Sequence, residues 1–319
     1  ALRTSGGKVL VDTAEEAAEV RHRAPIDLSA HAGPVLWVSL LGAVARGEVD
    51  PRTVLDVFVS AWPREESAAG LSRVALLVTS QVVPRFLPPA EQEGALARIA
   101  HAADALLSRS AGVPGPAGEA LAVLAARVWA RTGSDVDRLR RWTEGDGIPD
   151  VLAGDDDFRW AVLRRLATLG LLEDDEIEAA EAADHSLAGS LAALGVRAVR
   201  PTTAAKERAW ARLRDDPDLS NYAALAIAGG FWTAPDAALL RPYVDRVGDL
   251  VVGMSGRMGD DAVSRVVSAM HPTMLVEEGS LEASTAMLAR TDLTSGVRRA
   301  LVDADHELRE ALASRRRFG

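Results

Sequence analysis

Apolar residues recur at helical spacing along most of the chain from about residue 30 onward. Phe158, Val162 and Leu166 follow one another at intervals of four and therefore share one face of a helix. Gly, Pro and Asp bound such segments, and Asp50-Pro51 has the form of an N-cap followed by a proline in the first turn. The pattern predicts helices at residues 33–46, 51–61, 67–83, 89–109, 117–131, 135–143, 156–170, 173–183, 186–195, 202–214, 220–230, 235–248, 257–270, 280–290 and 295–315.

The connections between these segments are short, so consecutive helices are expected to be antiparallel neighbours. Stacked helix pairs of about 40 residues are typical of an α-solenoid. No strict sequence repeat is visible. We therefore expect an all-α fold, an irregular solenoid of the HEAT or armadillo kind whose antiparallel helix pairs curve into a bowl.

The first residues differ from the rest of the chain. Lys8 to Asp12 predict a short strand after the Ser5-Gly6-Gly7 turn, so residues 1–25 are interpreted as an N-terminal extension or the end of a preceding β domain. Residues 26–319 are expected to form the helical domain. Its subarrays are expected to be 26–150 and 151–319, on either side of a stretch rich in Gly, Asp and Pro.

Composition narrows the classes of function. Cysteine is absent, which excludes disulfides, thiolate metal sites and cysteine nucleophiles. A net charge of −10 disfavours a nucleic-acid partner. The sequence has no apolar run of the length that a membrane span or a secretory signal needs, so we expect a cytoplasmic protein with no membrane partner. The seven Trp, beside only two Tyr and five Phe, are predicted to fill the core with their indole N–H groups paired.

The candidate metal sites are weak. No two of the six His are three to five residues apart, so the His-Glu-x-x-His pattern of zinc hydrolases is missing. Asp155 to Asp157 are predicted to cap the helix that follows. Asp174 to Glu178 and Asp260 to Ser264 resemble the magnesium motifs of class I terpene synthases. The second motif, however, has Ser268 in place of its final Glu, and aromatics are scarce. We assign no metal ligand and no catalytic residue.

Several segments resemble one family in order and spacing. They are Asp157 to Ala167, Pro201 to Trp210, Asp218 to Asn221, Gly230-Phe231-Trp232, Leu239 to Val244, and Pro272 to Glu278. Together they are similar to the C-terminal helical domain of zinc aminopeptidases of the aminopeptidase N type. The actinobacterial members are the most similar, and the endoplasmic-reticulum aminopeptidases share this domain. The resemblance covers Pro25 to Arg316 and is strongest from 155 to 290.

The resemblance implies a domain that covers the active site of a larger enzyme and controls the access and selection of peptides. The catalytic and zinc motifs of that family do not occur in this sequence. The resemblance therefore implies zinc only in the parent enzyme, and this chain alone is expected to be inactive and to hold no cofactor. Its partners would be the N-terminal catalytic domain and peptide substrates. The absence of an initial Met fits a piece of a longer polypeptide.

Three residues are candidates for substrate binding: Tyr222, Arg257 and Arg265, which are polar positions within the best-matched helices. Family members often carry aromatic residues after the segment that ends at Val244. Here that stretch has lost them, although Arg257 remains. The alternative interpretation of the whole chain is a standalone helical-repeat module that binds a protein partner and needs no catalytic region.

Overall fold

The computed structural model describes residues 4–5, 8–9, 33–64, 66, 68–233 and 236–319. These residues form sixteen α-helices and one two-stranded hairpin, which confirms the predicted all-α class. The hairpin pairs β1 (Thr4–Ser5) with β2 (Lys8–Val9) in antiparallel register. The strand predicted from Lys8 is thus confirmed for its first two residues, and residues 10–12 lie outside the described part.

The chain divides into two compact units. Unit 1 comprises residues 1–134, 147–153 and 310–319, and unit 2 comprises residues 135–146 and 154–309. The helices of unit 1 are α2 (Gly33–Ala45), α3 (Pro51–Ala61), α4 (Ala68–Leu77), α5 (Pro89–Ser110) and α6 (Pro116–Thr132), with three other helical segments, η1 (Trp62–Arg64), η2 (Val78–Phe86) and η3 (Asp150–Leu152).

Unit 2 holds most of the remaining helices. They are α7 (Val136–Thr143), α8 (Asp156–Thr168), α9 (Asp174–Ala183), α10 (Leu187–Val199), α11 (Thr203–Asp215), α12 (Asn221–Phe231), α13 (Arg241–Val244), α14 (Val247–Ser255), α15 (Asp260–Met270), α16 (Glu278–Leu288) and the short 3₁₀ helix η4 (Ala237–Leu239). The last helix, α17 (Ser295–Phe318), contributes its residues up to Arg309 to unit 2 and the rest to unit 1.

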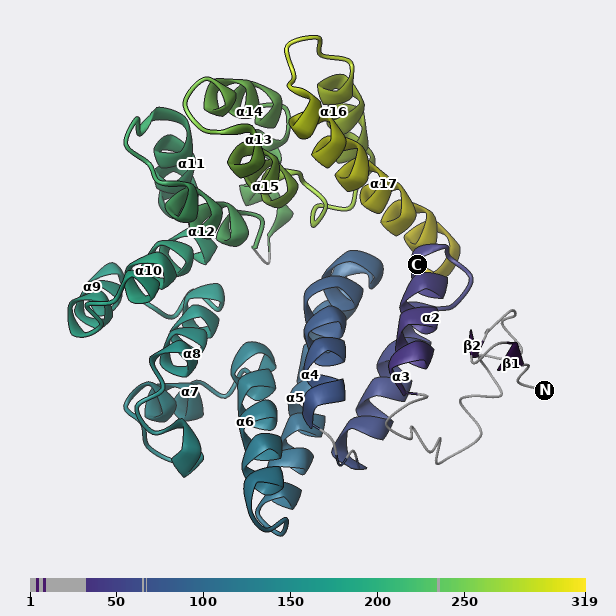
Figure 1. Ribbon diagram of the computed structural model, residues 1–319, viewed down its shortest axis with the longest axis vertical. Coiled ribbons are helices and arrows are strands. Elements are labelled where there is room, and N and C mark those ends of the chain that lie inside the picture. Colours follow the sequence, from purple (N-terminus) through teal and green to yellow (C-terminus); the bar gives the residue numbers. More distant parts are fainter. Residues whose placement is uncertain (1–3, 6–7, 10–32, 65, 67, 234–235) are drawn as a thin grey trace. The chain divides into compact units, whose positions relative to one another are not determined.

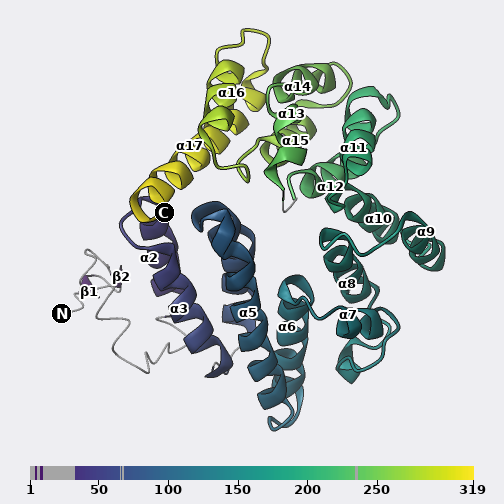
Figure 2. The same ribbon diagram turned by 180° about the vertical axis from the view of Figure 1, so that it is seen from behind.

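The helices of unit 2 pack as pairs. Helix α10 lies between α8 and α12, and α12 also packs on α15 (Figure 1). Helices α9 and α11 both contact α10, while α11 also contacts α12 and α14, and α14 contacts α15. The view from behind shows the same neighbours for α10 (Figure 2). Several consecutive helices therefore pack against each other, as the short connections predicted: α9 on α10, α10 on α11, α11 on α12, and α14 on α15.

Local signals explain where several helices begin. Asp50 Oδ1 accepts from the backbone N–H of Arg52 at 2.8 Å, and Asp155 Oδ1 accepts from that of Phe158 at 2.8 Å. These contacts confirm the predicted caps, because each side chain satisfies a donor that a helix leaves unpaired in its first turn. The acidic run before Phe158 is thus a helix start.

One predicted helix is wrong. The segment expected to be helical from 235 to 248 contains η4, α13 and the first residues of α14. The apolar residues Leu240, Tyr243, Val244 and Val247 have the spacing expected of one helix, and all four are indeed buried. Pro242 lacks an N–H and sits in the first turn of a new helix, so the chain turns there while the apolar side chains stay in the core.

The end of the predicted helix at 67–83 also differs. After α4 the chain widens into the π-helical segment η2, which includes Pro84. The Pro84 carbonyl accepts from Gln92 Nε2 at 3.1 Å and from Arg315 Nη2 at 2.8 Å. Side chains therefore satisfy a carbonyl at the point where the proline interrupts regular α-helical bonding.

The core of unit 2 is rich in aromatic rings, as the sequence predicted for Trp. Trp210, Phe231 and Tyr243 meet with ring centroids 5.0–5.6 Å apart. All seven Trp of the chain are buried. Their N–H groups are not equivalent, however. Trp232 donates to the Met270 carbonyl at 2.7 Å, whereas the buried Nε1 atoms of Trp62 and Trp210 have no hydrogen-bond partner among the described residues. The predicted pairing of the indole N–H groups is therefore wrong for these two.

Candidate functional site

Two of the three predicted substrate-binding residues are exposed polar side chains. Tyr222 lies in the first turn of α12 with 68% of its surface exposed. Arg265 lies on α15, its side chain is 67% exposed, and it pairs with Asp261 at 3.5 Å, one helical turn earlier. Both side chains are therefore available for contact with a ligand.

Arg257 is held by backbone groups. Its Nη2 donates to the Leu213 carbonyl at 3.0 Å and its Nη1 to the Asp216 carbonyl at 2.8 Å. These carbonyls lie at the C-terminal end of α11, where helix carbonyls lack partners within the helix. Arg257 thus ties the segment after α14 to α11. None of Tyr222, Arg257 and Arg265 lines the pocket described below.

Two carboxylates of the acidic string that resembled a magnesium motif are paired with arginines. Asp174 pairs with Arg200 at 2.5 Å and with Arg208 at 3.0 Å, and Glu176 pairs with Arg140. Partial burial would raise the pKa of Asp174, but the hydrogen bond and charge of Arg200 lower it overall. Asp174 and Glu176 therefore have protein partners. Among the described residues no group of His, Cys, Asp or Glu is placed to hold a metal ion.

A buried polar chain joins three helical segments of unit 2. Ser284 Oγ donates to Asp305 Oδ1 at 2.7 Å, and His271 Nε2 lies 2.8 Å from the same Oγ. Because the hydroxyl proton is directed to Asp305, His271 Nε2 must be the donor in its bond to Ser284. A serine nucleophile needs the reverse order, with His accepting its proton. His271 and Ser284 are also fully buried, so this set of hydrogen-bonded side chains has a structural role.

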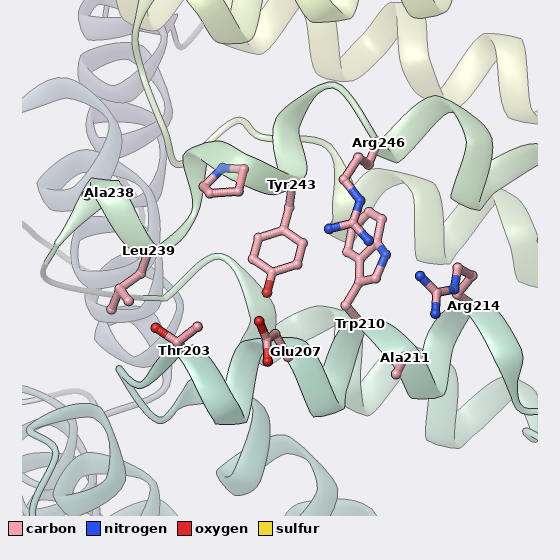
Figure 3. Close-up of a pocket in the computed structure, with 10 residues that line it drawn as sticks. Thr203, Glu207, Trp210, Ala211, Arg214, Ala238, Leu239, Tyr243 and Arg246 are labelled. Atoms are coloured by element: carbon pink, nitrogen blue, oxygen red, sulfur yellow. The ribbon is translucent and has the colours of Figure 1, made fainter.

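A pocket of about 420 Å³ lies between α11 and the segment formed by η4 and α13 (Figure 3). One wall is a single face of α11, with the residues Thr203, Glu207, Trp210, Ala211 and Arg214. This spacing of four, three, one and three residues keeps the side chains on one side of a helix.

The other wall comes from η4, from α13 and from the segment just after α13. It consists of Ala238, Leu239, Pro242, Tyr243 and Arg246. Figure 3 shows Leu239 and Thr203 at one end, Arg246 and Arg214 at the other, and the Tyr243 hydroxyl pointing toward the carboxylate of Glu207 between them.

The chemistry of the pocket is divided between an aromatic floor and a charged rim. The Arg246 guanidinium lies 4.9 Å from the ring centre of Trp210 and 5.2 Å from that of Tyr243. Burial raises the pKa of Tyr243, and the negative charge of Glu207 raises it further, so the phenol stays protonated at neutral pH. The pocket can thus present a phenol, a guanidinium and a carboxylate to one ligand.

Comparison with known proteins assigns most of the chain to a protein family. The sequence profile of the family described as ERAP1-like C-terminal domain matches residues 17–310. The chain belongs to this family. The ERAP1-like domain is also 28% identical over 183 residues to a protein described as aminopeptidase N from Streptomyces lividans. That alignment covers 57% of this chain and 21% of the relative, so the chain spans a minor part of the relative's length.

The family assignment confirms the resemblance found in the sequence. It concerns a domain that occurs within aminopeptidases, and it places no catalytic residue on this chain. Of the helices described in the ERAP1-like domain, none is both long enough and apolar enough to cross a bilayer.

Proposed function

We propose that this ERAP1-like domain covers the active site of an aminopeptidase of the aminopeptidase N type and controls which peptides reach it. The family match over residues 17–310 carries the proposal. The aligned segment is only 21% of the Streptomyces relative, which leaves ample room in such a polypeptide for a separate catalytic domain. That N-terminal domain would hold the zinc and the catalytic residues, since the described residues of this chain offer no metal-binding group.

A curved array of helix pairs over a metal cleft would act in three ways. It would restrict entry to unfolded peptide ends. It would exclude bulk water and thereby strengthen the electrostatic interactions of the substrate with the metal site. Its opening and closing would also influence turnover. The paired packing within unit 2 supports this proposal, because packed helices form stiff walls.

The exposed candidates Tyr222 and Arg265 are proposed to face the peptide. Both have solvent-facing side chains on well-packed helices, so their replacement would leave the core intact. Arg257 is proposed to act on the same face by positioning, because its guanidinium already bonds two carbonyls of the α11 end.

The size of the natural polypeptide tests the proposal first. An antibody raised against this chain is used to blot a lysate of the source cells. A band much heavier than the 33.7 kDa of this chain supports a covering domain that acts within a longer enzyme. A single band at 33.7 kDa contradicts that role and favours a standalone module that binds a protein partner.

Kinetics of the longer enzyme test the role in substrate selection. The Tyr222→Ala and Arg265→Ala variants are compared with the parent on a small chromogenic amino-acid substrate and on a series of longer peptides. We expect kcat/KM to fall for the longer peptides and to stay unchanged for the small substrate, which serves as the internal control. An unchanged length profile in both variants contradicts a peptide-facing role for these residues.

A further inference from the structure

The pocket between α11 and α13 contains two hydrogen-bond donors that the described protein does not satisfy. Trp210 is 3% exposed, and its Nε1 is buried without an acceptor. Arg246 lies over Trp210 and Tyr243, and no carboxylate of the described residues is ion-paired with it. A buried N–H without an acceptor is costly, and a guanidinium stacked on aromatic rings is well placed to bind an oxyanion.

The other charged residues of the pocket indicate which net charge a ligand would carry. Arg214 is already bound by both oxygens of Asp215, at 2.6 and 2.7 Å. Arg246 is therefore the cation left for a ligand, and Glu207 stands farther along the same groove. One unpaired cation beside a carboxylate favours a ligand with a single negative charge, because a second anionic group would be repelled by Glu207.

The remaining wall is apolar. Leu239 and Ala238 lie at the end of the pocket away from Arg246 (Figure 3), and Pro242 also lines the pocket. A cavity of about 420 Å³ is within the usual size range of small-molecule sites. A short hydrocarbon body would lie against these residues and bury apolar surface there.

We propose that this pocket binds a small organic monocarboxylate. Its carboxylate is held by Arg246 and by the indole N–H of Trp210, and its apolar body lies along Tyr243 toward Leu239. Arg246 covers the indole ring, so a carboxylate that draws the guanidinium aside also reaches the N–H. This site does not depend on the proposed covering role.

Nuclear magnetic resonance of the ¹⁵N-labelled full chain reports on this site directly, with hexanoate as the probe. The seven Trp give seven indole N–H signals, and the Trp210→Phe variant identifies that of Trp210. We expect hexanoate to shift this signal in a saturable manner. The neutral isostere hexanamide is expected to leave it in place, since a charged acceptor is required.

Two variants and a control sharpen the test. Arg246→Gln is expected to weaken hexanoate binding about tenfold or more, and Glu207→Gln is expected to strengthen it by removing repulsion. Arg212→Gln is the matched control, because Arg212 lies on the same helix, pairs with Asp216 at 3.5 Å and does not line the pocket.

Four results would overturn the proposal. They are the absence of a saturable shift with hexanoate, an equal shift with hexanamide, an equal loss of affinity in Arg212→Gln and Arg246→Gln, and binding of inorganic phosphate as tight as that of hexanoate. The last result would identify a general anion site without selection for an organic carboxylate. Circular dichroism of each variant verifies that the fold is retained.

Discussion

The ammonium group of Lys206 lies 2.7 Å from the backbone carbonyl oxygen of Phe231, in the interior of unit 2. The same Nζ donates to the carbonyls of Ala198 at 2.7 Å and Thr233 at 2.8 Å. Lys206 is fully buried, and its three protons match three acceptors at the ends of α10 and α12. One side chain of α11 thereby fastens the C-terminal ends of two neighbouring helices.

Replacement of this lysine should be strongly destabilising. Lys206→Met keeps the apolar stem but leaves three carbonyls without their donor, so we expect the free energy of unfolding to fall by about 3–5 kcal/mol. Urea denaturation measures the change. Arg208→Met is the control on the same helix, because its exposed pair with Asp174 should contribute less than about 1 kcal/mol. Equal losses in the two variants would contradict the role of Lys206.

The same residue should make stability depend on pH. Burial lowers the pKa of Lys206 to about 7, and the positive charge of Arg164 contributes in the same direction. The unfolded chain, with its ordinary lysine pKa near 10.4, binds more protons than the folded chain between these values. The contribution of Lys206 to the free energy of unfolding therefore rises with pH from about 7 to about 10, by at most about 1.4 kcal/mol per unit.

Urea denaturation of the wild type and of Lys206→Met at pH 7, 8 and 9 checks this dependence. The stability advantage of the wild type should grow with pH across the series. Parallel pH profiles would mean that Lys206 has the same pKa in the folded and unfolded states.

Two adjacent glycines of α12 should respond in opposite ways to the same substitution. A Cβ on Gly230 would lie 2.7 Å from the Gly195 carbonyl oxygen and 3.0 Å from Ala198 Cβ on α10. Gly230→Ala should therefore force the two helices apart and lower the free energy of unfolding by about 1–3 kcal/mol. A Cβ on Gly229 meets nothing within 4 Å, so Gly229→Ala should raise stability by about 0.5–1 kcal/mol.

Thermal and urea unfolding of both glycine variants test the close approach of α10 and α12. A tolerated Gly230→Ala, with stability equal to that of Gly229→Ala, would show that the two helices are farther apart than described.

Asp305 should contribute stability that acid removes. Burial raises its pKa, but hydrogen bonds from Arg309 and Ser284 outweigh this effect and lower the pKa below its usual range. A carboxyl with a lowered folded-state pKa contributes fully above the unfolded value near 3.9 and loses that contribution as the pH falls through the folded value. Asp305→Asn should cost about 1–3 kcal/mol at pH 7, and the difference from wild type should shrink below about pH 4.

Urea denaturation at pH 7 and at pH 3 measures the difference in the free energy of unfolding between the wild type and Asp305→Asn. Asp303→Asn is the control, since Asp303 is an exposed carboxylate on the same helix. An Asp305→Asn difference that is independent of pH would show that the lost interaction does not involve the charge of Asp305.

Helix periodicity found most of the elements because it depends only on neighbours along the chain. It failed at 235–248, where Leu240, Tyr243 and Val247 suit one helix but Pro242 starts another. It also placed the seven Trp in the core, although it could not show that the N–H of Trp210 finds no acceptor within the part of the chain that the structure describes. Whether a buried side-chain donor finds a hydrogen-bond acceptor depends on segments far away in the sequence, and the local spacing of residues does not predict which segments these are.

The sequence by itself determined the helical class, the caps at Asp50 and Asp155 and the family, because these rest on local propensity and on ordered motifs. Only the tertiary structure decided what Lys206, Arg257 and Arg246 do. A buried lysine, a guanidinium on a helix end and a guanidinium over two aromatic rings all look like ordinary surface cations in the sequence. Their roles arise from the carbonyls and rings that the fold brings within about 3–5 Å of them.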